Sequence, residues 1–233
     1  MTIKENAENI LDIVKNSAEK SGRTLEDITV IAVSKTVDSE KARQAIKADG
    51  IYSLGENRVQ EFTKKIEDLS DEDIDWHLIG HLQKNKVKYI IGKTKLIHSI
   101  ESLSLVEEID KRSKKNNLIT DVLIEVNMAE EESKFGLNKE EVLPFIEKMK
   151  QFDNVKVKGL MTVAPYSEIT EQIRWVFKEM KTLFDNIKLK ELPNTEFEYL
   201  SMGMSNDFEI AIEEGANIIR VGTKIFGERN YDI

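Results

Sequence analysis

The chain has 233 residues, a mass of 26.8 kDa and a formal net charge of −9. A chain this acidic is poorly suited to nucleic acid, because phosphate contacts need clustered lysine and arginine side chains. It has no cysteine, which excludes disulfides, thiolate metal sites and cysteine nucleophiles. No apolar run approaches the ~18 residues that span a bilayer, and residues 1–21 lack the apolar core of a signal peptide. We therefore expect a cytoplasmic protein with neither a nucleic-acid nor a membrane partner.

Short apolar runs alternate with longer segments of helical periodicity along the whole chain. Between Ile3 and Ala18, apolar side chains recur every three or four positions, which predicts a helix that ends near Gly22. The next run, 28–33, predicts a buried strand. Further strands are predicted at 51–54, 76–79, 96–100, 121–126, 157–163, 197–200 and 218–221. Helical segments separate nearly all of these strands, and the polar stretch 127–136 is expected to be a loop.

Pro144 leaves the start of one helix open. If the helix starts at Asn138, the proline lies in its interior, where it removes a backbone hydrogen bond. If Leu143 is the cap, the proline falls at the first helical position, where it is well tolerated.

Eight strands, nearly all followed by a helix, predict parallel β/α units. Eight such units favour an α/β protein closed into a (β/α)8 TIM barrel, a fold that takes ~250 residues, so a single domain would span residues 1–233. A doubly wound open sheet is the alternative, because it produces the same alternation and a sequence pattern does not reveal closure. In a barrel the active site lies at the carboxyl ends of the strands, so the residues that follow each strand are the candidate site residues.

Lys35 follows the first predicted strand directly. Partial burial at a barrel mouth would lower the pKa of its amine and make it a nucleophile toward carbonyl groups. A lysine that simply extends to solvent is the alternative interpretation.

The segments after the seventh and eighth strands carry small and hydroxyl-bearing residues. Ser201 and Ser205 flank Gly203, which allows the backbone to approach a ligand closely, and Gly222 and Thr223 follow the eighth strand. Barrels frequently bind phosphate with the loops after strands seven and eight. The sequence therefore favours a phosphate site here over simple helix caps.

Other polar residues near strand ends are less specific. Arg220 lies within an apolar strand and needs a partner, either a structural ion pair or a ligand acceptor. After the second strand, Asn57 could contact a ligand, and Glu56 could pair with Arg58 or with an arginine of another strand.

The three histidines do not predict a metal site. His77 and His81 are four residues apart, but the strand assignment and Gly80 break any shared helical face, and His98 lies on another strand. A zinc site would lack a clear third ligand, so no metal is expected.

Taken together, a lysine after strand one and a phosphate site after strands seven and eight suggest pyridoxal 5′-phosphate (PLP). The sequence resembles the PLP homeostasis proteins, single-domain relatives of the barrel of alanine racemase with the fold type III architecture. The matching stretches run in order along the chain at 32–35, 55–57, 76–86, 159–162, 200–207 and 220–227.

The resemblance implies a role for each matching residue. Lys35 would hold PLP as a Schiff base, the internal aldimine, and Arg220 would face the pyridine nitrogen. The other implied cofactor-binding residues are Asn57 beside the ring and Ser201, Ser205, Gly222 and Thr223 at the phosphate. Lys134 matches a position near the mouth to which no role is assigned.

The resemblance also implies a function in vitamin B6 and amino-acid homeostasis, with delivery of PLP to apo-enzymes. An arginine at the ring nitrogen keeps that nitrogen unprotonated and makes the cofactor a weaker electron sink. Racemisation also needs acid–base groups on both faces of the substrate carbon, which in racemases come in part from a second domain. We therefore expect a monomeric PLP carrier without catalytic activity. A weakly active racemase-type or aldolase-type enzyme, and a phosphate-binding barrel without PLP, are the alternatives.

Overall fold

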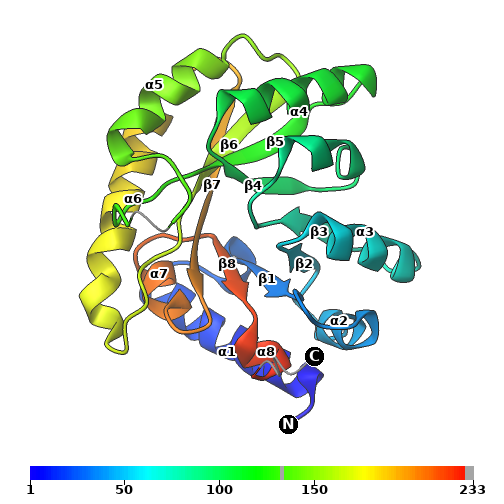
Figure 1. Cartoon of the computed structure of the whole chain (residues 1–233). Helices are drawn as coiled ribbons and strands as arrows, with labels where there is room; N and C mark the ends of the chain where they lie inside the picture. Colours follow the sequence, from blue (N-terminus) through cyan, green and yellow to red (C-terminus); the bar gives the residue numbers. More distant parts are fainter. Residues whose placement is uncertain (132–133, 229–233) are drawn as a thin grey trace.

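The computed structural model describes residues 1–131 and 134–228, and its centre is a closed barrel of eight parallel strands in chain order (Figure 1). Closure is direct, since Ile31 of the first strand is in register with Ser53 on one side and with Arg220 on the other. The predicted TIM barrel is confirmed, and the open sheet is excluded. The strands are β1 Thr29–Val33, β2 Ser53–Glu56, β3 Asp75–Leu78, β4 Leu96–Ile100, β5 Thr120–Glu125, β6 Val155–Met161, β7 Thr195–Met204 and β8 Ile218–Val221.

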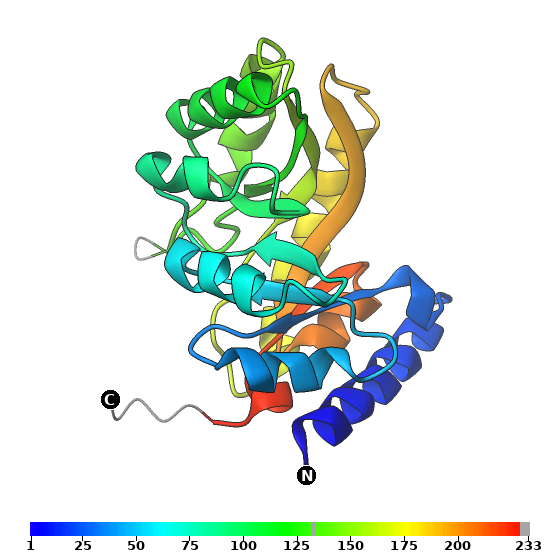
Figure 2. The same cartoon turned by 90° about the vertical axis from the view of Figure 1, so that its right-hand side faces the viewer.

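Helices cover the outside of the barrel (Figures 1 and 2). They are α1 Ile3–Lys20, α2 Ser39–Ile46, α3 Val59–Asp68, α4 Leu103–Lys115, α5 Lys139–Met149, α6 Arg174–Lys188, α7 Phe208–Glu213 and α8 Thr223–Phe226. Three short 3-10 helices complete the set at Leu25–Asp27, Lys84–Tyr89 and Thr170–Ile173. The first helix packs beside the last, where the Asn6 amide donates to the Ile225 carbonyl at 3.0 Å.

Two apolar layers account for the stability of this arrangement. A small inner layer fills the barrel and consists of Ile31, Val33, Leu96, Leu123, Met161 and Ile218. A larger outer layer lies between the strands and the apolar stripes of the helices, with Phe62, Phe177 and Phe208 fully buried. Since side chains alternate along a strand, β1, β4, β5, β6 and β8 contribute to both layers. The inner layer leaves room for polar side chains at the mouth.

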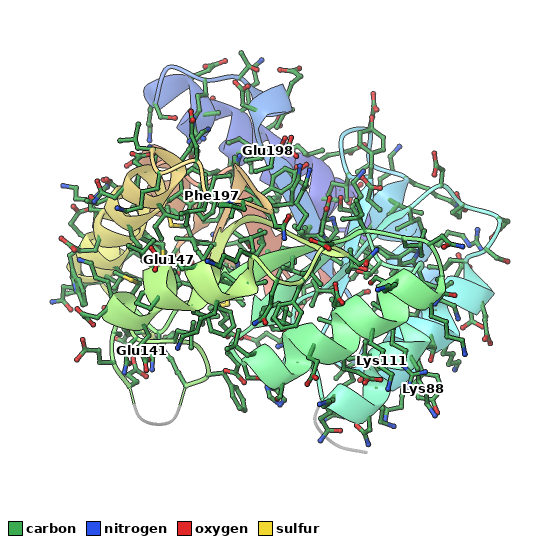
Figure 3. All side chains as sticks on the ribbon, turned by 90° about the horizontal axis from the view of Figure 1, so that it is seen from above. Lys88, Lys111, Glu141, Glu147, Phe197 and Glu198 are labelled. Carbon is green, nitrogen blue, oxygen red and sulfur yellow. The ribbon has the colours of Figure 1, made fainter. Side chains whose placement is uncertain are left out.

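Charged side chains lie on the outer faces of the helices. From above the view of Figure 1, Lys88, Lys111, Glu141 and Glu147 extend from the helical layer, and all four are exposed (Figure 3). Within residues 1–131 and 134–228, no helix is long and apolar enough to cross a membrane.

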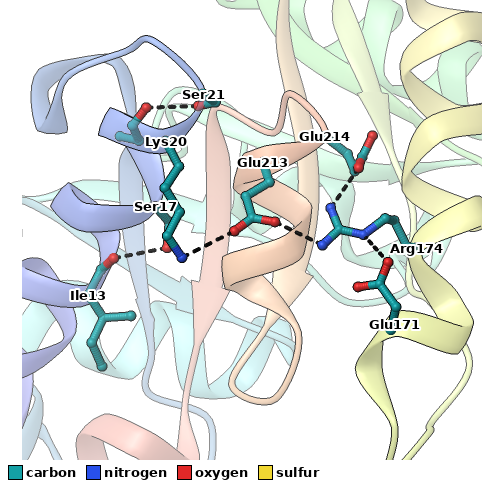
Figure 4. Close-up of polar contacts among 9 residues, drawn as sticks. Ile13, Ser17, Lys20, Ser21, Glu171, Arg174, Glu213 and Glu214 are labelled. Carbon is teal, nitrogen blue, oxygen red and sulfur yellow. Dashed lines mark hydrogen bonds and ion pairs between the residues drawn. The ribbon is translucent and has the colours of Figure 1, made fainter.

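Arg174 ties together segments that are distant in sequence (Figure 4). Its guanidinium pairs with Glu171 at 2.6 Å, with Glu213 at 2.8 Å and with Glu214 at 2.7 Å. Lys20 also approaches Glu213, at 3.4 Å. The network joins the end of α1, the end of α7 and the start of α6.

Helix α5 begins at Lys139, which matches the first of the two starts that the sequence left open, because Asn138 and Glu141 form a reciprocal capping box. Pro144 therefore lies inside the helix on its exposed side. Strand β7 extends to Met204, where the sequence pattern ended it at Leu200. Its last residues pair with β8 through an irregularity in register, so Ser201 belongs to the strand and not to the loop after it.

Candidate functional site

A cavity of about 550 Å³ opens at the carboxyl ends of the strands. Its walls include Lys35 after β1, Asn57 after β2, Ile79 after β3, residues 163–167 after β6, residues 204–207 around the end of β7, and Gly222 with Thr223 after β8. Arg220 and Lys134 also line it. The volume suits a small organic ligand.

The backbone on both sides of Lys35 is held by acidic side chains. On one side, the Ser34 hydroxyl donates to Glu56 Oε1 at 2.5 Å. On the other side, the Thr36 amide donates to Glu61 Oε2 at 2.7 Å. Thr36 has a φ of 63°, a conformation that a β-branched residue adopts only under constraint. The half-buried Lys35 side chain is thus presented to the cavity by a tight, strained turn.

Glu56 makes a buried ion pair beneath this turn. Lys65 Nζ lies 2.5 Å from Glu56 Oε1 and also donates to the Ser34 carbonyl. Burial raises the pKa of Glu56, and the Lys65 charge opposes that rise. The expectation that Glu56 pairs with Arg58 or another arginine is wrong, because α3 carries Lys65 inward against the end of β2.

The segments after β7 and β8 meet as predicted. The Gly222 amide donates to Ser205 Oγ at 3.1 Å, which leaves the Ser205 hydroxyl hydrogen available to a ligand. Gly203 makes the turn into α7 possible: its φ is +94°, and an added Cβ would lie 2.7 Å from the Ala211 Cβ. The Asp207 carboxylate accepts from the Met204 amide at 2.5 Å and further fixes the turn.

Arg220 is fully enclosed yet reaches the cavity wall. Nη1 donates to Ser201 Oγ at 2.6 Å, and Nη2 donates to the Thr162 carbonyl at 2.8 Å. In the described part of the chain no carboxylate lies within ion-pair distance of it, and burial lowers its pKa to about 10. The sequence left open an ion pair or a ligand, and the structure places neutral oxygens around two of its nitrogens.

Behind Arg220 the barrel interior holds two histidines that the sequence did not relate to each other. His98 Nδ1 lies 3.0 Å from Ser201 Oγ, and His98 Nε2 lies 3.0 Å from His77 Nδ1. Both rings are buried. The sequence did contain a signal for this contact, because side chains alternate between the two faces of a strand and each histidine sits at an inward-facing position of neighbouring strands.

Glu125, at the end of β5, was also not singled out from the sequence. Burial raises its pKa to about 7, nearby Glu101 adds to the rise, and Arg220 opposes it. The mouth therefore contains a carboxyl group that can change its charge near neutral pH.

Six of the seven predicted site residues line the cavity: Lys35, Asn57, Ser205, Arg220, Gly222 and Thr223. Ser201 lies behind it, with its hydroxyl bonded to Arg220 and near His98. His81 is not among the lining residues, and its Nδ1 lies 3.0 Å from Glu101 Oε1. Among the described residues, no cluster of three histidine, aspartate or glutamate side chains is arranged to hold a metal ion.

Comparison with known proteins agrees with this geometry. The family described as alanine racemase, N-terminal domain, matches residues 10–230. An alanine racemase from Clostridium difficile superposes with a TM-score of 0.70 over 98% of this chain and 61% of that one, at 17% identity, a likeness of fold alone. The chain is therefore a barrel of the alanine racemase N-terminal class.

Closer relatives define a narrower group. The pyridoxal phosphate homeostasis protein of Aquifex aeolicus is 46% identical over 97% of this chain and 98% of its own length. The protein of the same name from Escherichia coli is 33% identical over 98% of this chain and 97% of its own. This chain belongs to the pyridoxal phosphate homeostasis protein family.

Solved structures extend the comparison. PipY of Synechococcus elongatus, in a structure with PLP bound, is 30% identical with a TM-score of 0.79 over 92% of this chain and all of that one. A protein of unknown function from Bifidobacterium adolescentis is 34% identical with a TM-score of 0.90 over 96% of this chain and 94% of its own.

Proposed function

We propose that this protein binds PLP in the mouth cavity through Lys35 and serves as a carrier of the cofactor. The single observation that carries the proposal is the convergence, in one cavity, of a primary amine, a hydroxyl-bearing turn and a buried guanidinium. The names of the relatives and the PLP-bound state of the Synechococcus protein point the same way. When bound, PLP supplies an aldehyde that condenses with a primary amine, and a pyridine ring that draws electrons.

The residues of the cavity fit the chemical groups of PLP. A phosphate needs donors, and the hydroxyls of Ser205 and Thr223 and the small Gly222 supply them and the room. A pyridine nitrogen needs one donor, which Arg220 offers. Asn57 Oδ1 is buried without a partner in the described part of the chain, so the wall of the cavity has an unsatisfied polar atom that a ligand can complete.

Each binding residue has a distinct task in this proposal. Lys35 provides the attaching amine, held in place by the turn between Ser34 and Thr36. Arg220 keeps its own proton because guanidinium remains charged, so it donates to the ring nitrogen and leaves that nitrogen without a proton. A ring in that state is a weaker electron sink, which favours storage over turnover of amino acids. Ser201 contributes through Arg220 and not by direct contact.

An absorbance titration with PLP tests the site. The wild-type protein should develop a visible band that the Lys35→Ala variant lacks, and borohydride reduction followed by peptide mass spectrometry should place the label on Lys35. The exposed Lys64 provides a matched control, since Lys64→Ala should leave the band unchanged. A wild-type protein without any band would overturn the proposal and favour a phosphate-binding barrel of another kind.

We further propose that the carrier acts as a monomer, transfers PLP to apo-enzymes and has no catalytic activity of its own. Protein loaded with PLP should restore activity to a PLP-dependent apo-enzyme faster than a sample that holds the same total amount of PLP already released from the carrier by dilution. Exchange of the α-hydrogen of amino acids in heavy water, dependent on Lys35, would instead establish the racemase-type alternative. Light scattering of loaded and unloaded protein tests the monomer.

A further inference from the structure

A chain of polar side chains crosses the interior of the barrel from the cavity wall to β3. It runs from Arg220 Nη1 to Ser201 Oγ at 2.6 Å, on to His98 Nδ1 at 3.0 Å, and from His98 Nε2 to His77 Nδ1 at 3.0 Å. Every member is buried, Ser201 and His98 completely. Polar groups this deep in an apolar barrel are costly unless each contact is a proper hydrogen bond.

Only one assignment of hydrogens satisfies every contact in the chain and also gives the Ser201 hydroxyl hydrogen an acceptor among the described residues. Arginine has no acceptor, so Arg220 must donate to the Ser201 oxygen. If His98 Nδ1 also donated to that oxygen, the Ser201 hydroxyl hydrogen would have no acceptor among the described residues. The Ser201 hydroxyl therefore donates to His98 Nδ1. A neutral His98 then carries its hydrogen on Nε2 and donates it to His77 Nδ1, so the His77 hydrogen is also on Nε2.

We propose that Ser201, His98 and His77 are positioning residues that hold the Arg220 guanidinium in a single orientation toward the ring nitrogen of the cofactor. The proposal rests on the PLP site described above. Two of the five guanidinium hydrogens are fixed from behind, one on Ser201 and one on the Thr162 carbonyl at 2.8 Å. The remaining hydrogens belong to a side chain that lines the cavity. Reversing the two histidine contacts would make His98 Nδ1 a second donor to Ser201 Oγ and would leave the Ser201 hydroxyl hydrogen without an acceptor among the described residues.

The electrostatic surroundings keep both imidazoles neutral, as the chain requires. Burial, with the Lys95 charge acting in the same direction, lowers the pKa of His77 to about 3. Burial also lowers the pKa of His98, with His77 and Arg220 acting in the same direction. The carboxylates near this group, Asp207 and Glu125, act on Arg220 and favour its charged form. A protonated His98 would present a second donor to Ser201 and break the chain.

His77, the member of this hydrogen-bonded series farthest from Arg220, has one ring nitrogen that is unsatisfied among the described residues. His77 Nε2 is buried and has no partner within the described residues. With the hydrogens assigned as above, that atom is an N–H donor directed away from His98, and the unsatisfied group falls at the end farthest from the cavity. The hydrogen bonds nearest Arg220 are complete, so the imperfection does not reach the guanidinium.

Nitrogen-15 NMR of the imidazole rings tests the direction of the chain without any ligand. The protein has only three histidines, so His77→Phe and His81→Phe variants assign all the signals. His98 and His77 should both be the Nε2–H tautomer and should not titrate between pH 5 and 9. A hydrogen on Nδ1 of His98, or titration of either ring in that range, would overturn the proposal.

PLP titrations of matched variants test the effect on Arg220. His98→Leu removes the acceptor of Ser201, and His98→Asn restores an acceptor close to the Nδ1 position. Ile218→Val trims the same apolar layer beside Ser201 without touching a hydrogen bond. His98→Leu and Ser201→Ala should raise the Kd for PLP about tenfold, the scale of one hydrogen bond to a charged group, and should shift the visible band. His98→Asn and Ile218→Val should stay close to wild type.

The outcomes separate the two proposals. If the wild-type protein does not bind PLP, the proposed function is overturned, and the positioning role of Ser201, His98 and His77 is overturned with it. If the wild type binds and His98→Leu binds with the same Kd and spectrum, the PLP site stands and the positioning role is overturned. Equal losses in His98→Leu, His98→Asn and Ile218→Val would also overturn it, because they would reflect packing alone. Circular dichroism establishes that each variant is folded. The NMR experiment is read on the wild-type protein and uses variants only to assign the signals.

Discussion

Replacing Lys65 by methionine should strongly destabilise the protein in a pH-dependent way. The side chain is 4% exposed, its Nζ lies 2.5 Å from Glu56 Oε1, and Glu56 is completely buried. Lys65→Met keeps the apolar volume and removes the charge, so Glu56 is left buried and unpaired. Breaking one side of a buried pair costs ~3–5 kcal/mol, a large part of the ~5–15 kcal/mol that stabilises a typical domain.

The pH dependence follows from the Glu56 carboxyl. Burial already raises its pKa above the ordinary value of 4.5, and Lys65 is the main group that opposes the rise. Without the lysine, the folded-state pKa rises further. A raised folded-state pKa contributes stability that is present below 4.5 and lost as the pH increases through the folded value. The cost of Lys65→Met should therefore be larger at pH 8 than at pH 5.

Urea unfolding of the wild type and four variants at pH 5 and pH 8 measures this effect. The variants are Lys65→Met, Glu56→Gln, the double variant, and Lys64→Met as an exposed control on the same helix. The double variant should recover most of the loss, because replacing both partners leaves no unpaired charge. The control should stay within about 0.5 kcal/mol of wild type. A Lys65→Met cost below 1 kcal/mol at pH 8, or one independent of pH, would refute the reasoning.

Three further changes test other parts of the mouth. Glu125→Gln should stabilise the protein at pH 8 and not at pH 4, because the folded-state pKa of Glu125 is raised from 4.5 to about 7 and the wild type loses stability as the pH rises through that window. Each unit of pKa shift is worth about 1.4 kcal/mol, so urea unfolding at pH 8 should show a gain of up to ~3 kcal/mol, and an equal gain at both pH values would contradict this. Gly203→Ala should lower the melting temperature and weaken PLP binding, because φ is +94° and the new Cβ would lie 2.7 Å from the Ala211 Cβ; calorimetry that shows wild-type stability would disprove the clash. Thr36→Asn should stabilise the fold by about 1 kcal/mol in the same unfolding assay, since asparagine accepts the φ of 63° that a β-branched residue resists, and a loss of stability would show that the threonine side chain has another role.

Much of the architecture was predictable because it depends on local chemistry. Short continuous apolar runs between helical segments identified all eight strands, since a strand buried on both sides must be apolar along its length. The meeting of the residues after β1, β7 and β8 at one cavity was predictable because parallel strands bring their carboxyl ends to one edge. Where the local signal was mixed, the predicted boundary was wrong: β7 runs four residues further than the pattern indicated, because Ser201 and Met204 pair with β8, which lies far away in sequence.

The sequence by itself thus determined the order of β/α units, the position of Lys35 and the meeting of the two loops that hold Ser205 and Gly222. The tertiary structure alone decided that the sheet closes, that Glu56 is paired with Lys65, and that His98 lies against Ser201, 103 residues away. The physical reason is that periodicity reports which face of an element is buried, whereas the partner on that face is set by closure and strand register. The sequence can indicate that a polar side chain is buried and needs a hydrogen bond, but only the folded barrel determines which atom is its partner.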